Sequence, residues 1–354
     1  MQLPIFDGHN DSLQRLSPYS RDHVAAFLNH NATGHLDLPR ARAGGLGGGF
    51  FAIFIPSQPV DTLLAPMEVI ITANGYEVPL AAPLDHSTAQ AATMAMMAGV
   101  FRLESVAQSQ IKVVRTVAEL TACLQNGIFA IILHCEGAEA IDPQLDALEV
   151  FYQAGLRSLG VVWSRPNTFG HGVPFQFPQS PDTGPGLTDA GRALVRGCNE
   201  LGIMLDVSHL NERGFWDLAA LTTAPIVATH SAVHALCPTT RNLTDKQLDA
   251  IRDSDGMVGV NFEVSALRSD GYDEPQTPLA VLIEHIEYLV ERLGIDRVGF
   301  GSDFDGATMP QELGDVAGLP KLITQLQQRG YDEPALRKLA YQNWQRVLGK
   351  TWRT

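Results

Sequence analysis

Short runs of apolar residues recur along the chain, each bounded by glycine, proline or charged residues, and the pattern predicts strands. Most are separated by segments in which apolar residues return every three or four positions, as on one face of a helix. The predicted strands cover residues 5–9, 48–55, 127–136, 157–163, 202–209, 224–230, 256–263 and 296–304. Runs without polar alternation are typical of strands buried on both faces of a parallel sheet.

The segments between these runs carry helix signals. One helix is expected to be capped near Thr188, with Asp189 in its first turn, and another to end at Gly294. Residues 56–126 hold two helical patterns, around 60–76 and 88–109, before the next strand. The alternation favours an α/β fold in which residues 1–354 form a single (β/α)₈ TIM barrel domain with an enlarged crossover after strand 2. A doubly wound open sheet is the structural alternative.

Histidine and carboxylate side chains stand at the ends of most predicted strands. They are His9, Asp11, Glu136, His209, His230, Asp303 and Asp305. In a barrel, the carboxyl ends of the strands meet at one mouth, where active sites are built. Any one of these residues has a structural explanation, as do His134 and Asp206, but their coincidence at one end does not. Because buried charges are costly unless neutralised, the pattern indicates a divalent metal site.

Imidazole and carboxylate ligands without a thiolate suit zinc best, with manganese or cobalt as substitutes. Residues two apart on a strand share a face, so His9 and Asp11 can bind one ion together. Asp7 shares that face and is either a partner for His9 or the first residue of a loop. A lone zinc rarely takes five protein ligands, which argues for two ions bridged by a carboxylate, with Glu136 as the candidate. Such a pair would hold a hydroxide and indicates hydrolysis.

Composition narrows the class of partner. The net charge of −14 and a pI near 5.1 argue against a nucleic-acid partner, which normally needs a basic face. The four cysteines show no paired spacing and are expected to be reduced thiols. We find no secretory signal, membrane span or lipid-anchor tail, so the expected location is cytoplasmic and no membrane partner is expected.

Six motifs together resemble the membrane (renal) dipeptidase family, dizinc peptidases of the metallo-dependent hydrolase class. In chain order they are FDGHND, HCEG, DVSH, ATHS, TTRNLTD and GFGSDFDG, and the similarity as a whole spans residue 5 to about residue 348. The resemblance implies that His9 and Asp11 bind one zinc, that His209 and His230 bind the second, and that Glu136 bridges them. It further implies that Asp303 is the acid and base and that Arg241 holds the substrate's C-terminal carboxylate. A guanidinium fork suits that task because it matches a carboxylate bidentately.

The chain also departs from the family pattern. Trp163 stands about where the family has a histidine that contacts substrate. His171 could replace it from the loop, Arg165 could do so, or the zinc ions could act alone. A loop histidine without a role is an equally open reading of His171.

The resulting hypothesis is a dizinc metallopeptidase that hydrolyses dipeptides, including those with a D-residue at the C-terminal position, by means of a metal-bridging hydroxide. Residues 163–186 and 256–275 are expected to line its pocket. The alternative is another metal-dependent amidohydrolase acting on N-acyl amino acids or lactams. A catalytically silent binding protein is a third reading. The amphipathic C-terminal segment leaves two possibilities open, contact in a homodimer and packing on its own barrel.

Overall fold

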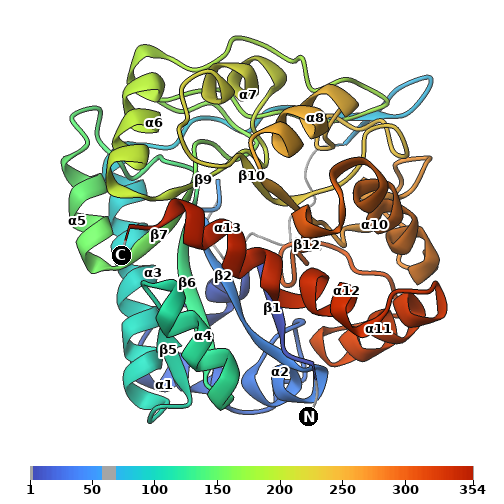
Figure 1. The fold of residues 1–354 in the computed structure, drawn as a ribbon. Coiled ribbons are helices and arrows are strands. Elements are labelled where there is room, and N and C mark those ends of the chain that lie inside the picture. Colours follow the sequence, from blue (N-terminus) through green and yellow to red (C-terminus); the bar gives the residue numbers. More distant parts are fainter. Residues whose placement is uncertain (1–2, 58–68, 354) are drawn as a thin grey trace.

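The computed structural model describes residues 3–57 and 69–353, and its centre is a closed parallel barrel (Figure 1). The barrel strands are β1 (Ile5–Asn10), β2 (Leu46–Ile53), β6 (Phe129–Glu136), β7 (Leu156–Gly160), β9 (Met204–Asp206), β10 (Val227–Ser231), β11 (Met257–Val260) and β12 (Val298–Phe300). They neighbour one another in chain order, β1 pairs with β12, and β2 pairs with both β1 and β6. Since no edge is left between β2 and β6, the open doubly wound sheet is excluded and the predicted TIM barrel is confirmed.

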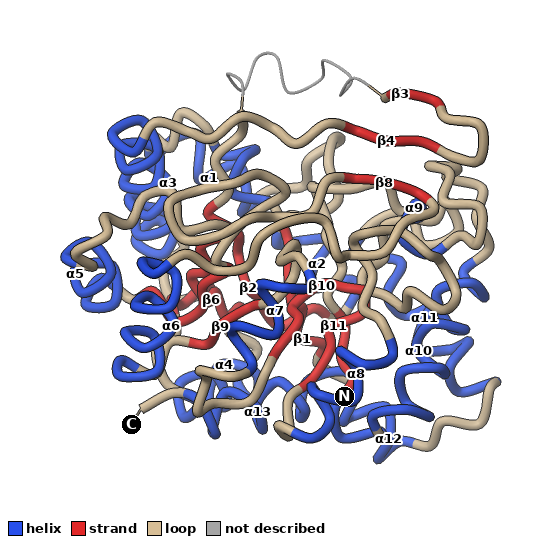
Figure 2. The backbone as a smooth tube through the Cα atoms, turned by 90° about the horizontal axis from the view of Figure 1, so that it is seen from above, coloured by secondary structure: helices blue, strands red, loops and turns tan. Residues whose placement is uncertain are grey.

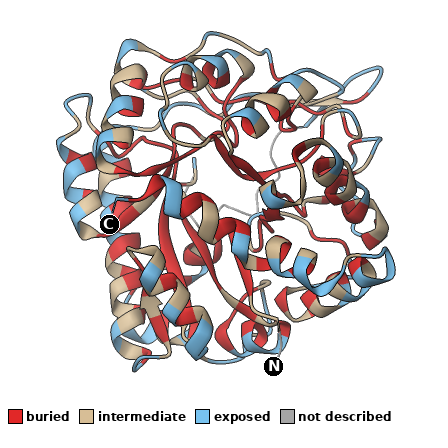
Figure 3. Ribbon diagram, viewed as in Figure 1, coloured by how far each residue is buried: buried red, intermediate tan, exposed pale blue. Residues whose placement is uncertain are grey.

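Helices surround the barrel. They are α1 (Arg21–Ala25), α2 (Leu38–Gly44), α3 (His86–Val106), α4 (Val117–Asn126), α5 (Asp146–Ala154), α6 (Asp189–Leu201), α7 (Glu212–Ala219), α8 (Asp245–Asp253), α9 (Val264–Leu267), α10 (Leu279–Leu293), α11 (Leu319–Gln328), α12 (Glu333–Arg337) and α13 (Asn343–Thr351). The expected helix ends are confirmed, since the Thr188 hydroxyl accepts a hydrogen bond from Gly191 N at 3.0 Å and Gly294 follows α10. Buried positions face the strands and exposed ones face outward (Figure 3).

The enlarged second crossover differs from the prediction. It contains α3, but also β5 (Ile111–Val113), a short strand that pairs with the first residues of β6. Part of the helix expected around 60–76 falls on residues 58–68, outside the described residues. In the rest of that segment the chain forms β3 (Ile70–Ile71) and enters β4 (Tyr76–Val78) instead.

A small antiparallel sheet lies at the mouth of the barrel. It joins β3 and β4 to β8 (Phe175–Phe177), which follows β7. Figure 2 shows this sheet at one end of the molecule and α13 at the other. The mouth therefore carries extra structure supplied by the long connections after β2 and β7.

Trp344 of α13 closes the opposite end, which we call the floor. Its indole packs with Phe6 and Phe50 inside the barrel, and Nε1 donates to Phe300 O at 3.2 Å. Glycines leave room for the ring: a Cβ on Gly259 would lie 2.9 Å from the indole carbon Cζ2. The amphipathic C-terminal segment thus packs on its own barrel.

All four cysteines are buried and unpaired, as expected of reduced thiols. Within residues 3–57 and 69–353, no helix combines the length and apolar character needed to cross a membrane.

Candidate active site

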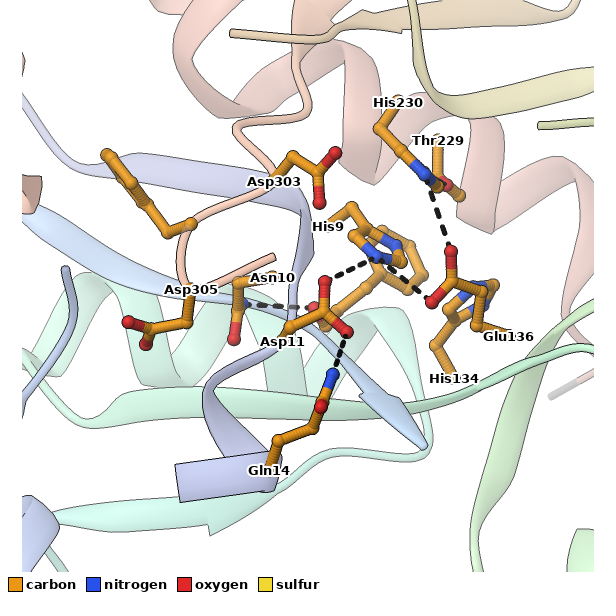
Figure 4. A network of polar contacts seen from close by, with 12 residues as sticks. His9, Asn10, Asp11, Gln14, His134, Glu136, Thr229, His230, Asp303 and Asp305 are labelled. Carbon is orange, nitrogen blue, oxygen red and sulfur yellow. Dashed lines mark hydrogen bonds and ion pairs between the residues drawn. The ribbon is translucent and has the colours of Figure 1, made fainter. Parts of the chain in front are cut away.

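Five side chains predicted as metal ligands converge at the mouth. His9 belongs to β1 and Asp11 follows it, Glu136 is the last residue of β6, His230 belongs to β10, and His209 follows β9. His209 has a positive φ of 65°, which turns its ring inward. All five are buried, and Figure 4 shows His9, Asp11, Glu136 and His230 pointing toward one another.

One group of three combines Glu136, His209 and His230. Glu136 Oε1 lies 3.0 Å from His209 Nε2 and 3.6 Å from His230 Nε2, and the two nitrogens lie 3.1 Å apart. Two ligands that are each about 2.0 to 2.1 Å from a tetrahedral zinc ion stand about 3.3 Å apart. The three atoms therefore already have the spacing of one face of a zinc coordination sphere.

The second group combines His9, Asp11 and Glu136. His9 Nε2 lies 3.4 Å from Asp11 Oδ2 and 3.7 Å from the other Glu136 oxygen, Oε2. The ligand atoms of each group lie within 4.8 Å of one another. Because the two oxygens of Glu136 face different groups, this carboxylate is placed to bridge two ions.

The electrostatics of the site also favour a bound cation. Neither ring nitrogen of His9 has a hydrogen-bond partner among the described residues. Burial opposes protonation of His9, but the carboxylates of Glu136 and Asp11 outweigh it and raise its pKa to about 10. Burial, with the nearby positive charges, lowers the pKa of His209 and His230, which keeps them in the neutral form that binds metal.

Asp303 stands beside the groups on the loop after β12, again at a positive φ of 63°. Its carboxylate lies within 4.8 Å of ligand atoms of His9 and His230 and accepts a hydrogen bond from Asn261 Nδ2 at 3.1 Å. Burial raises the pKa of Asp303 to about 7. Asp305 points away (Figure 4) and binds Ser12 Oγ and His35 N.

Hydrogen bonds behind the ligands fix the orientation of their rings. Asp206 accepts hydrogen bonds from Ser208 N at 2.9 Å and from Thr229 N at 2.8 Å, and also from the Thr229 hydroxyl at 2.6 Å. Because the Thr229 hydroxyl donates its hydrogen to Asp206, its oxygen accepts a hydrogen bond from His230 Nδ1 at 2.9 Å. His230 Nε2 is left as the lone pair that faces the site.

Other buried polar residues near the site have structural roles. Ser164 Oγ contacts His209 Nδ1 at 2.8 Å, and His134 contacts Ser158 Oγ at 2.8 Å. Asp7 accepts hydrogen bonds from Ser302 N and Oγ, and the same hydroxyl contacts His9 O at 3.2 Å. Asp7 therefore steadies the backbone of the ligand strand rather than the His9 ring.

A cavity of about 480 Å³ opens beside the ligands. Asp11, Glu136, His209, Asp303 and Arg241 line it. The expected loops contribute Trp163, Phe175, Glu263, Ser265, Gly271, Tyr272 and Asp273, and the unforeseen hairpin of β3 and β4 adds Val69, Ile71, Tyr76 and Val78. Arg241 is buried, donates from Nη2 to His230 O at 3.2 Å, and has no described partner at Nε.

The two candidate substitutes for the family histidine do not reach this cavity. Arg165 is wholly buried, and its guanidinium donates hydrogen bonds to Glu139, Ser57 and Ile55 O at 2.6 to 2.9 Å. His171 forms a strand bridge with Pro166 and is absent from the described lining. Trp163 occupies that side instead, with its ring centroid 5.8 Å from that of His209.

Comparisons with known proteins identify the family. The model of the membrane dipeptidase family (peptidase family M19) matches residues 1–353. A metallopeptidase structure from Rhodobacter sphaeroides, liganded with a phosphinate mimic of the dipeptide L-Ala-D-Ala, is 51% identical with a TM-score of 0.93, covering 99% of this chain and 100% of that one. An uncharacterised protein from the pqqA 5′ region of Klebsiella pneumoniae is 53% identical over 235 residues, 66% of this chain and 87% of that protein. The dipeptidase aclJ of Aspergillus oryzae is 27% identical over 354 residues, 98% of this chain and 78% of that protein.

Proposed function

Since the chain belongs to the membrane dipeptidase family (peptidase family M19), a family of metal-dependent hydrolases that act on dipeptides, we propose that it is a dizinc dipeptidase. The observation that carries the proposal is the position of the Glu136 carboxylate, whose two oxygens face two separate groups of ligands. His9 and Asp11 would hold one ion, and His209 and His230 the other.

The residues present fit zinc in three respects. The ligand spacing matches tetrahedral coordination, the set contains imidazole and carboxylate without thiolate, and the ring nitrogens of His9 lack a hydrogen bond within the described residues. Bound zinc would supply a nucleophile at neutral pH and polarise the scissile carbonyl. The protein's own groups must then position the substrate and move protons.

Asp303 is placed to move the proton. It borders both ligand groups, and Asn261 holds one of its oxygens, so the carboxylate keeps a fixed direction toward the ligands. We assign it the task of taking a proton from the attacking water and delivering it to the departing amine, which requires a carboxylate within hydrogen-bond reach of both.

Arg241 is placed to bind the C-terminal carboxylate of a dipeptide. Its guanidinium is held by His230 O at one end and faces the cavity without a described partner at Nε. A charge-assisted pair with a carboxylate would satisfy it. Such an anchor favours short substrates, because a longer peptide would place chain where Arg241 lies.

The Rhodobacter sphaeroides relative binds a mimic of L-Ala-D-Ala, which supports a D-residue at the C-terminal position for this chain as well. The test is metal analysis of the purified protein combined with kcat/KM for L,L and L,D dipeptides and for N-acyl amino acids. We expect two zinc ions per chain and cleavage of the L,D dipeptides. One ion per chain would overturn the dizinc assignment, and faster cleavage of N-acyl amino acids would favour the wider amidohydrolase class.

A further inference from the structure

The cavity beside the ligands has two chemically different walls. Phe54, Trp163 and Phe175 form one, which we call the aromatic wall, and Glu263, Ser265 and Asp273 form the other, the acidic wall. Phe54 follows β2 and Trp163 follows β7, whereas the acidic wall follows β11. In the barrel order β11 stands opposite β6, which β2 and β7 flank, so the walls face each other across the mouth.

The carboxylates of the acidic wall accept hydrogen bonds from hydroxyl groups. Glu263 accepts a hydrogen bond from Ser265 Oγ at 2.7 Å, and Asp273 accepts one from Thr308 Oγ1 at 3.1 Å. Throughout the described part of the chain, no lysine or arginine forms an ion pair with either. The ligand groups do not use these carboxylates. Glu263 is half-buried, and the positive charge that acts on it is that of Arg241. Once Arg241 pairs with a substrate carboxylate, Glu263 loses that compensation, so a cationic group of the same ligand would be stabilised here.

Arg241 fixes which end of a substrate meets the acidic wall. It is 6% exposed, lines the same cavity, and follows β10, the strand paired with β11. Burial lowers the pKa of Arg241, and the carboxylate of Glu263 is the largest of the negative charges that oppose this shift. Both residues line the same cavity and follow the paired strands β10 and β11. A C-terminal carboxylate held by Arg241 therefore leaves the side chain of the same residue next to Glu263.

We propose that Glu263 and Asp273 select dipeptides whose C-terminal residue carries a cationic side chain, an amine or a guanidine, while the aromatic wall receives the apolar side chain of the first residue. The inference rests on the proposed function, because it takes Arg241 as the carboxylate anchor. It adds a substrate class that follows from charges not used in the chemistry.

The test compares kcat/KM of the zinc-loaded protein for L-Ala-Lys, L-Ala-norleucine and L-Ala-Glu, each with the C-terminal configuration that the parent cleaves. Lysine and norleucine side chains have similar apolar stems, so their ratio isolates the charge. We expect the lysine substrate to exceed norleucine by about tenfold, with glutamate the poorest. Glu263→Gln should bring the lysine to norleucine ratio close to one, and Asp273→Asn should lower it less, since Asp273 is exposed at the rim.

Glu284→Gln is the matched control, because it removes the same charge from an exposed position outside the cavity. A purely structural role for Glu263 would lower kcat/KM for all three substrates together and leave their ratio unchanged. Equal rates for lysine and norleucine in the parent overturn the inference while leaving dipeptidase activity established. Failure to cleave any dipeptide overturns the proposed function instead. If Glu263→Gln does not fold, the parent's ratio and the Asp273→Asn variant still decide the question.

Discussion

The two ends of the barrel are built from the same strands but by opposite rules. At the floor, Trp344 fills the space between Phe6 and Phe50, and its one polar atom donates to Phe300 O. At the mouth, the ring nitrogens of His9 and Nε of Arg241 have no hydrogen-bond partner in the described chain. The indole nitrogen at the floor finds its hydrogen-bond partner within the protein, whereas the nitrogens at the mouth would be satisfied by a metal ion and a substrate. Substitutions at the floor should therefore change stability, and those at the mouth should change chemistry.

Asp303→Asn is expected to show the largest effect on catalysis without an effect on stability. The amide keeps the shape but cannot exchange the proton, so we expect kcat to fall about 10²- to 10⁴-fold with metal content unchanged. Steady-state kinetics and metal analysis on the same sample provide the measurement. Asp305→Asn is the control within this loop, because Asp305 binds Ser12 and His35 N and should change stability more than kcat. Parent-level turnover in Asp303→Asn would remove Asp303 from the mechanism.

The floor is tested by Trp344→Ala. Loss of a wholly buried indole should lower the free energy of unfolding by about 3 to 5 kcal/mol, measured by urea denaturation, while the folded fraction keeps its metal. Trp344→Phe retains most of the volume and should cost less. Loss of zinc without loss of stability would contradict the division between floor and mouth.

A histidine near the mouth with both nitrogens satisfied gives a third test. His285 Nδ1 accepts from Val233 N at 3.1 Å, Nε2 contacts Leu267 O at 2.9 Å, and burial lowers its pKa from 6.5 to about 4. Between these values the unfolded chain binds a proton that the folded chain does not. Its contribution to stability is therefore complete above pH 6.5 and is lost as the pH falls toward 4, by up to about 3 kcal/mol. Glutamine can make the same two contacts without titrating. The measurement is the free energy of unfolding of His285→Gln and of the parent in urea at each pH, and the effects of Glu and Asp cancel in the difference because both proteins share them. Parallel curves for the two proteins would argue against the buried neutral histidine.

The smallest expected effect comes from Thr229→Val. It removes the hydroxyl between Asp206 and His230 while keeping the shape, so zinc affinity should fall about 10- to 100-fold, as judged by competition with a chelator. Ser164→Ala tests the equivalent contact of His209. Unchanged affinity in both variants would mean that packing alone orients these rings.

The sequence contained the barrel and the ligands for related reasons. Strands such as β6 are buried on both faces, so they appear as continuous apolar runs, and a ligand such as Glu136 stands out as the charge at the end of one. The strands β3 and β5 are only 2 and 3 residues long, too short for periodicity to register. The residues that hydrogen-bond to the ligands and to Asp303 could not be predicted, because they lie far from them along the chain, as Asn261 does from Asp303. Only the adjacency of Thr229 to His230, together with Asp206 in DVSH, offered a signal.

The glycines that admit Trp344 also set an order of events during synthesis. Gly8 belongs to β1, the first of the described strands in chain order, yet the ring that fills the space above it belongs to α13, the last of the described helices. The strands can begin to associate as they emerge, but the interior of the floor stays open to water until α13 is released. We therefore expect the nascent chain to acquire its final stability only after α13 has been synthesised, and removal of residues 343–353 to destabilise the interior of the barrel rather than its surface.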